Sequence, residues 1–217
     1  MAKSVDELLS WIYEPVERGV LARKYDAWAS TYDDDLGAGY RVSPVAAARA
    51  LARALRDPAG RVLDAGAGTG MCGAELHELG WRNVEAADLS EQMLEVARRK
   101  GVYRAHHRCD LEEDAGFFPA ASFDGIVTAG VLTRGHAGHR AVRTLDGWLR
   151  PGGVAVVAIR RDYLESQPQL REVFTTVAWE LEAVDAVTIF DATEIDVRTY
   201  RKRESERGGA ERARARR

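Results

Sequence analysis

The residues best suited to chemistry are three glycines at alternating positions, Gly66, Gly68 and Gly70, in the stretch VLDAGAGTG. Glycine lets a backbone turn tightly and approach a ligand with no side chain in the way. The first turn of a following helix would add free N–H groups that suit an anionic group. Asp88 ends the next predicted strand, where a carboxylate can accept hydrogen bonds from both hydroxyls of a ribose. The spacing therefore predicts a nucleotide-binding loop.

Two classes of cofactor fit this pattern, and Asp64 distinguishes them. Gly68, Gly70 and Gly73 also satisfy the dinucleotide fingerprint, which would indicate an NAD(P)-dependent oxidoreductase. In that case Asp64 would place a negative charge beside a pyrophosphate, which is unfavourable. Beside the positively charged methionine end of S-adenosylmethionine, the same carboxylate is favourable, and the sequence contains no Tyr-x-x-x-Lys pair. We therefore expect S-adenosylmethionine as the cofactor, with S-adenosylhomocysteine as its product.

The loop and the carboxylates must be positioned by strands and helices that alternate along the chain. Apolar runs bounded by turns predict seven strands, at residues 61–66, 83–89, 102–111, 123–132, 152–160, 186–191 and 194–202. Helices are predicted at residues 4–14, 18–31, 44–56, 71–80, 90–101, 138–149 and about 169–183, with Pro44 in the first turn of its helix. This alternation indicates an α/β fold with a doubly wound, mostly parallel, Rossmann-like seven-stranded sheet. The last two strands are expected to form a hairpin that places an antiparallel strand at the end of the sheet.

The length and composition fit one globular domain with additions at both ends. The chain has 217 residues, of which 46% are hydrophobic and 30% are charged. We expect a helical cap at residues 1–57, a cofactor-binding domain at 58–203 and a disordered basic tail at 204–217. Residues 201–217 contain eight basic and three acidic residues, so the remaining body has a net charge of −8 and would repel nucleic acid. The N-terminus lacks the basic start and apolar core of a signal peptide, and we expect a cytoplasmic protein without a membrane partner.

The ordered set of motifs resembles a known family. The stretches VLDAGAGTG, AADLSEQMLEVARRKG, RCDL, FDGIVTAGVL and LRPGGVAVV resemble successive motifs of the class I S-adenosylmethionine-dependent methyltransferases. The upstream stretch YDAWASTYDDDLGAGYRVSP, together with GVLTRGH, is similar to the methyltransferase-like twenty-seven group, the Williams–Beuren-region methyltransferases. The resemblance runs from about Lys24 to Arg160. It implies an enzyme that transfers a methyl group.

The resemblance also implies a role for each matching position. The methionine end of the donor would lie over the loop residues Gly66, Ala67, Gly68 and Gly70, with Asp64 near its amino group. The adenosine would be held by Asp88 at the ribose, by Leu89 and Met93 against the adenine, and by Asp110 and Leu111 at the ring nitrogens. Beneath the sulfonium would lie Ala129 and Gly130, and Tyr32 would close over the donor from the cap.

Transfer from a sulfonium needs alignment of donor and acceptor more than new chemistry. His136, which follows the fourth strand, is the predicted general base for an acceptor that carries a proton, and Tyr32 is the alternative polar contact. His136 and His139 have no carboxylate or thiol nearby in the sequence, so we expect no metal site. A cap of this size predicts a small-molecule acceptor, at an O, N or C atom, in a monomer or homodimer. The alternatives are an NAD(P)-dependent oxidoreductase and a non-catalytic S-adenosylmethionine-binding regulatory protein.

Overall fold

Seven strands form one mixed sheet in the order β3-β2-β1-β4-β5-β7-β6. The computed structural model describes residues 5–190 and 193–204, so the expected basic tail beyond residue 204 lies outside the described residues. The strands are β1 (Val62–Ala65), β2 (Val84–Asp88), β3 (Ala105–Arg108), β4 (Phe123–Ala129), β5 (Leu149–Arg160), β6 (Trp179–Ile189) and β7 (Thr193–Lys202). Strands β1 to β5 pair in parallel, and β7 is antiparallel to both of its neighbours. The strand order reverses between β1 and β4, and ligands bind at the carboxyl ends of the strands beside such a reversal.

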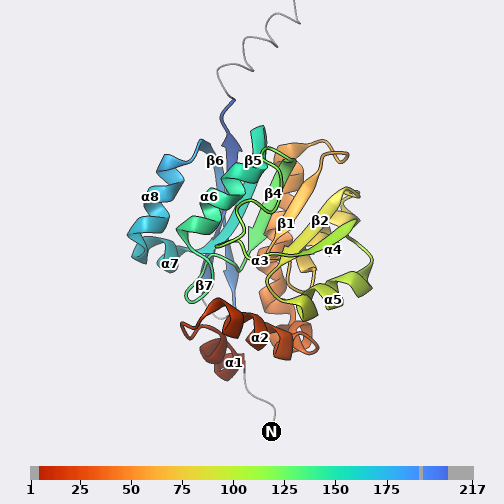
Figure 1. Ribbon diagram of the computed structural model, residues 1–217, viewed down its shortest axis with the longest axis vertical. Helices are drawn as coiled ribbons and strands as arrows, with labels where there is room; N and C mark the ends of the chain where they lie inside the picture. The colour runs from red at the N-terminus through yellow and green to blue at the C-terminus, as the bar shows by residue number, and fades with distance from the viewer. Residues whose placement is uncertain (1–4, 191–192, 205–217) are drawn as a thin grey trace, which may run out of the picture.

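Helices cover both faces of this sheet (Figure 1). They are α1 (Val5–Ile12), α2 (Arg18–Trp28), α3 (Tyr32–Leu55), α4 (Met71–Glu78), α5 (Glu91–Lys100), α6 (His139–Trp148), α7 (Arg161–Ser166) and α8 (Pro168–Thr176). Successive residues of a strand point to opposite faces, and β4 shows this directly. Ile126 belongs to the core formed with α6, α7 and α8, whereas Val127 belongs to the core formed with α3, α4 and α5. The predicted doubly wound fold is confirmed.

A cap of helices lies against the carboxyl ends of the parallel strands. Figure 1 shows α1 and α2 together at one end of the sheet. They form their own small core with the start of α3, which includes Ile12, Leu21 and Trp28. Two aspartates attach this cap to the loops of the sheet. Asp26 accepts hydrogen bonds from the Ser90 hydroxyl (2.6 Å) and the Gln92 N–H (3.1 Å). Asp33 accepts from the Thr69 hydroxyl (2.5 Å) and pairs with Lys100 (2.7 Å).

The C-terminal part of the sheet differs from the sequence prediction in two ways. The predicted helix at 169–183 is wrong beyond Thr176, because β6 begins at Trp179. The Trp179 ring packs 5.6 Å from the ring of Tyr200 on β7, a contact between distant segments that overrides local helix propensity. The hairpin does form, but its antiparallel strand β7 lies between β5 and β6 instead of at the end of the sheet. Residues such as Val197 and Tyr200 make β7 a buried strand, while residues 180–186 of β6 are exposed, as suits an edge.

The helix that contains Pro44 also begins earlier than predicted. Pro44 lies inside α3, which starts at Tyr32 and is interrupted only at Gly37, where φ is +61°. Three aspartates, Asp33 to Asp35, occupy the first turn, where negative charge stabilises the positive end of a helix dipole. The consequence is that Tyr32 and Tyr40 lie on either side of the break at Gly37, and both line the cavity beside the strand ends.

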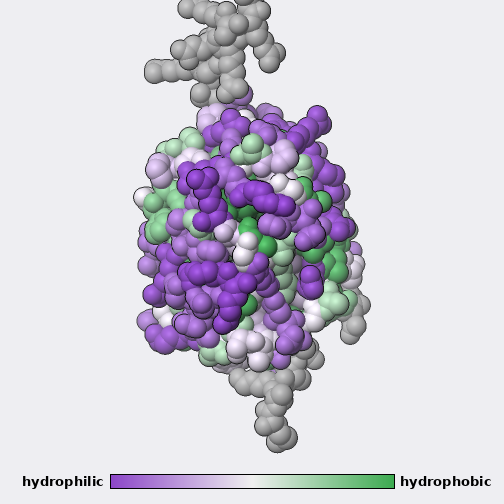
Figure 2. All heavy atoms as spheres, turned by 90° about the vertical axis from the view of Figure 1, so that its right-hand side faces the viewer, coloured by the Kyte–Doolittle hydropathy of each residue, from purple (hydrophilic) through white to green (hydrophobic). Residues whose placement is uncertain are grey.

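Hydrophilic side chains cover most of the side of the molecule that carries α4 and α5, and hydrophobic ones show between them in smaller areas (Figure 2). Among the residues that the structure describes, no helix combines the length and apolar character needed to cross a bilayer.

Candidate functional site

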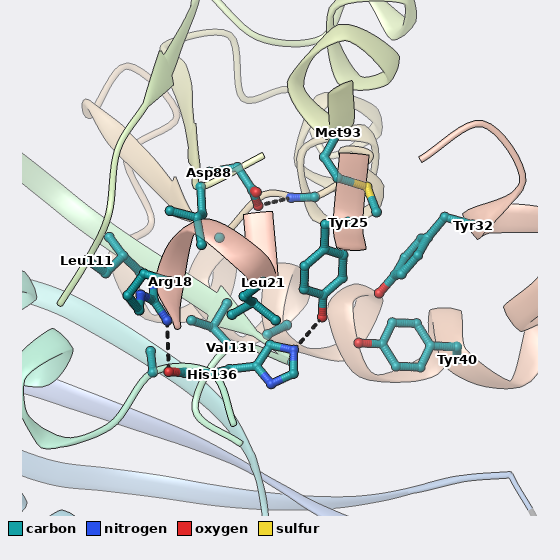
Figure 3. A pocket seen from close by; sticks show the side chains of 16 residues that line it. Arg18, Leu21, Tyr25, Tyr32, Tyr40, Asp88, Met93, Leu111, Val131 and His136 are labelled. Carbon is teal, nitrogen blue, oxygen red and sulfur yellow. Dashed lines mark hydrogen bonds between the residues drawn. The ribbon is translucent and has the colours of Figure 1, made fainter. Parts of the chain in front are cut away.

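A cavity of about 630 Å³ lies between the cap and the carboxyl ends of the strands (Figure 3). Ten of the predicted site residues line it: Tyr32, Gly66, Gly68, Asp88, Leu89, Met93, Leu111, Ala129, Gly130 and His136. The cap adds Arg18, Leu21, Tyr25 and Tyr40. A neighbouring cavity of about 370 Å³ is lined by Asp64 and Ala67 and shares Tyr32, Tyr40, Gly66, Gly68 and Ala129 with the first.

The glycine loop forms the wall common to both cavities. Gly66 has a φ of +78°, and a Cβ at this position would lie 2.1 Å from Cγ2 of Val131. The loop therefore packs directly against the segment that follows β4. Gly70 lines neither cavity and is the N-cap residue of α4. The free end of α4 thus follows the loop, as the sequence predicts.

Asp88, at the end of β2, is fixed by backbone donors. The Gly68 N–H donates to its Oδ2 (2.8 Å) and the Ser90 N–H donates to its Oδ1 (2.9 Å). Burial raises the pKa of this carboxyl, while those N–H groups favour the ionised form. Each carboxylate oxygen can accept a second hydrogen bond. Asp88 can therefore hold a diol while it also holds the glycine loop.

Asp64, at the end of the β1 apolar run, is only 2% exposed. Its Oδ2 accepts a hydrogen bond of 2.5 Å from the hydroxyl of Tyr103, a residue that the sequence reading did not select. Burial raises the pKa of Asp64 to about 7, partly offset by the Tyr103 hydrogen bond. In the described part of the chain, no Lys or Arg forms an ion pair with it. A buried carboxylate without a cationic partner, facing a cavity, is suited to bind a cationic ligand group.

Asp110, which follows β3, does not line these two cavities but binds the cap. Nε of Arg18 donates a hydrogen bond to Oδ2 of Asp110 (2.8 Å), and Nη2 of Arg18 donates one to Oδ1 (2.6 Å). Nη1 of Arg18 also donates to the main-chain oxygen of His136 (2.9 Å), as Figure 3 shows. Arg18 was missed by the sequence reading, because nothing near it in the chain indicates a partner 92 residues away. It joins α2 to the loops after β3 and β4.

His136 points into the larger cavity and is held in one tautomer. Its Nδ1 lies 2.8 Å from the Arg134 carbonyl oxygen, which can only accept, so Nδ1 carries the proton. Nε2 is then the acceptor for the Tyr25 hydroxyl at 2.6 Å (Figure 3). Burial lowers the pKa of His136 to about 4, and the charges of Arg18 and Lys24 act in the same direction. The imidazole is therefore uncharged at neutral pH and accepts a hydrogen bond from the Tyr25 hydroxyl.

Tyrosines form the cap side of the cavity. Tyr25, Tyr32 and Tyr40 line it, with centroid distances of 6.3 Å between Tyr25 and Tyr32 and 6.0 Å between Tyr32 and Tyr40. Trp28, also on α2, packs against Tyr32 in the cap core and lines neither cavity. Burial raises the pKa of each of these three hydroxyls, so all three are neutral donors.

A third cavity of about 360 Å³ adjoins the first on the far side of Tyr40 and Gly130. Its walls are aliphatic, from Leu132, Ala158, Ile189 and Ile195, with the polar groups of Tyr13, Ser43, Thr133 and Arg160. Within residues 5–190 and 193–204, no three His, Cys, Asp or Glu side chains are grouped so that they could hold a metal ion. The polar groups that line these cavities are thus carboxylates, phenols, hydroxyls, guanidinium groups and one imidazole.

Comparison with known proteins agrees with this geometry. Residues 63–157 match the family model described as "Methyltransferase domain". The chain is 31% identical over 160 residues to methyltransferase-like protein 27 of Homo sapiens, an alignment that covers 73% of this chain. The chain spans 64% of the length of that curated relative.

Solved structures show the same fold at lower identity. The 1,6-didemethyltoxoflavin-N1-methyltransferase of Burkholderia thailandensis, solved with S-adenosylhomocysteine, has a TM-score of 0.64 and 23% identity, covering 94% of this chain and 92% of that one. The [4+2]-cyclase SpnF has a TM-score of 0.68 and 14% identity, covering 88% and 98%. One fold therefore supports different reactions, and the site must decide between them. Residues 63–157 form a class I S-adenosylmethionine-dependent methyltransferase domain, in a chain that resembles methyltransferase-like protein 27.

Proposed function

We propose that this protein binds S-adenosylmethionine in the two joined cavities and transfers its methyl group to a small-molecule acceptor. One observation carries the proposal: two carboxylates, Asp64 and Asp88, lie at the ends of neighbouring strands on either side of the glycine loop. Asp64 is buried without a cationic partner, and Asp88 keeps free acceptor capacity. A ligand with a cation at one end and a diol at the other satisfies both carboxylates, and S-adenosylmethionine is such a ligand.

Most of the remaining predicted residues line the two cavities in positions that suit this donor. The methionine part would lie over Gly66, Ala67 and Gly68, with Gly70 behind them at the start of α4, and the adenine would lie between the side chains of Leu89, Met93 and Leu111. Asp110, which lines neither cavity, would contribute to the adenine end through its two hydrogen bonds to Arg18, a residue of the cavity wall. Ala129 and Gly130 would lie below the sulfur, with Tyr32 above it.

The third cavity is the proposed acceptor site. It meets the donor cavity at Gly130 and Tyr40, next to the position assigned to the sulfur. Its enclosure between the cap and the sheet favours a small molecule over a nucleic acid or a protein surface. In this proposal the cap of residues 1–57 closes over the domain at 58–203 and excludes water from the reaction.

When bound, S-adenosylmethionine supplies a methyl group already activated by its positively charged sulfur. The protein then has to hold the acceptor in line with the carbon–sulfur bond and remove a proton where the acceptor carries one. The Tyr32 hydroxyl provides a polar contact at that point, and His136 is the candidate base. The Tyr25 hydroxyl donates a hydrogen bond to Nε2 of His136. A proton from the acceptor would therefore reach the imidazole through Tyr25 or after this hydrogen bond breaks.

Calorimetry of the purified protein with S-adenosylhomocysteine, S-adenosylmethionine and NAD(H) tests the donor site. We expect binding of the two adenosyl ligands and none of NAD(H). Binding of NAD(H) alone would contradict the proposal and support the oxidoreductase alternative. Methyl-labelled donor with pools of small hydroxyl, amine and carbon acids then tests transfer. Donor binding without labelled product from any pool would point to the non-catalytic alternative.

A further inference from the structure

Tyr103 reaches the donor site from outside the predicted motifs. It lies between α5 and β3, and its side chain is 9% exposed. Its hydroxyl donates to Oδ2 of Asp64 (2.5 Å) and accepts from the N–H of Gly73 in the first turn of α4 (3.1 Å). The hydroxyl therefore connects a helix, a strand end and the loop between them.

The fold makes room for this ring at the cost of helix propensity. A Cβ at Gly73 would lie 2.1 Å from Cζ of Tyr103, so only glycine allows the ring to occupy this place. Glycine inside a helix is less favourable than alanine by about 1 kcal/mol. The presence of glycine at position 73 is thus explained without a bound pyrophosphate. It allows the Tyr103 hydroxyl to come within hydrogen-bond distance of Asp64.

The surroundings of Asp64 make this hydroxyl important. Asp64 is faced by Asp88 from β2, by the Cys72 thiol and the Gly73 N–H from α4, and by Tyr103. From α3, Tyr32 and Tyr40 line the same cavity. Burial and the Asp88 charge oppose ionisation of Asp64, whereas the Tyr103 hydroxyl and the Gly73 N–H favour it. Oδ2 accepts the Tyr103 hydrogen bond, and Asp64 lines the second cavity, where a ligand group can reach it.

We propose that Tyr103 is a positioning residue of the donor site, whose hydroxyl orients the Asp64 carboxylate and keeps it ionised for the ammonium group of the donor. This inference rests on the proposed function. It predicts that Tyr103 acts only on ligands that carry the ammonium group. It also predicts that the hydroxyl sets the pH at which such ligands bind.

The test is Tyr103→Phe, which keeps the ring beside Gly73 and removes only the hydroxyl. Binding of S-adenosylhomocysteine and of 5′-methylthioadenosine, which lacks the amino acid part, is measured by calorimetry between pH 5.5 and 8.5. For the wild-type protein, S-adenosylhomocysteine should bind more tightly as pH rises and level off above about 7, because Asp64 must lose its proton. Tyr103→Phe should weaken the binding of S-adenosylhomocysteine about 10-fold at pH 7 and move the midpoint of its pH dependence to higher pH. Binding of 5′-methylthioadenosine should not change.

Two controls separate this effect from a general loss of structure. Tyr163→Phe removes a hydroxyl from α7, which packs against the core formed with α6 and α8. It should leave the affinities for S-adenosylhomocysteine and 5′-methylthioadenosine unchanged. In an Asp64→Asn background, Tyr103→Phe should have little further effect, since the two residues act through one hydrogen bond.

The outcomes distinguish the inference from the proposed function. Equal weakening of both ligands by Tyr103→Phe, or an unchanged pH midpoint for S-adenosylhomocysteine, would overturn the positioning role. Failure of the wild-type protein to bind either ligand would instead overturn the proposed donor site.

Discussion

Replacing Asp64 by asparagine should make the unliganded protein more stable at neutral and alkaline pH. The native carboxyl, buried without a cation, has its pKa raised to about 7, whereas in an unfolded chain an aspartate titrates near 3.9. Below about pH 4 both states hold the proton. Between about pH 4 and 7 the unfolded state releases it and the native state keeps it, so the free energy of unfolding falls as pH rises.

The size of this effect follows from the difference of about three pKa units. At about 1.4 kcal/mol per unit, ionisation of Asp64 costs the native state on the order of 4 kcal/mol at pH 8. Asparagine cannot ionise, keeps nearly the same volume and still offers an oxygen to the Tyr103 hydroxyl. We therefore expect Asp64→Asn to match the wild type near pH 4 and to exceed it by up to about 4 kcal/mol at pH 8, about 8–16 °C in Tm for a chain of this size.

Urea unfolding of both proteins from pH 4 to 8 measures this difference, in which the titration of groups that do not interact with Asp64 cancels. Asp196→Asn is the matched control, because Asp196 is also buried but is paired with Arg161 (2.8 Å). That substitution should lower stability at pH 8, since it removes the buried carboxylate that Arg161 and Arg198 share and leaves Arg161 only the exposed Glu194. A stability gap for Asp64→Asn that does not grow between pH 4 and 8 would refute the reasoning about Asp64.

Four further predictions concern the ribose carboxylate, the packing beside the donor loop and the base. Asp88→Ala should weaken S-adenosylhomocysteine about 100-fold or more in calorimetry, because two hydrogen bonds to a charged group are worth about 1.5–3 kcal/mol each; an unchanged affinity would contradict the ribose role. Gly73→Ala should lower the free energy of unfolding by about 1–3 kcal/mol, because the new Cβ would lie 2.1 Å from Cζ of Tyr103; an unshifted urea midpoint would show that the ring does not need this space. His136→Ala should leave donor affinity intact and slow transfer about 100-fold or more, and equal turnover would exclude His136 as the base. Because the pKa of His136 is lowered to about 4 in the ligand-free protein, the acid limb of kcat/KM for the acceptor, measured at saturating donor, should lie near pH 4 and not near 6.5, since the base works only when deprotonated.

Much of the fold follows from local patterns that need no knowledge of distant contacts. The apolar run that ends in Gly66, the capped helix after Ser90 and the seven separated strand patterns predict a parallel sheet. In such a sheet the carboxyl ends of the strands converge whatever the loops between them, so Asp64 and Asp88 had to lie near each other. For the same reason, most of the predicted cofactor residues line the joined cavities.

The tertiary structure decided which residues complete the site. Arg18 meets Asp110 across 92 positions, Tyr25 meets His136 across 111, and Tyr103 meets Asp64 across 39. No periodicity or capping signal in the sequence can select such pairs, because they depend on how the cap and the loops pack in space. The same is true of β6, which forms a strand where Trp179 packs against Tyr200. The sequence alone thus determined the strand ends and the charges that they bring together. Only the packing of distant segments determined that those charges are buried, which carboxylate is left without a cation and which tyrosines face it.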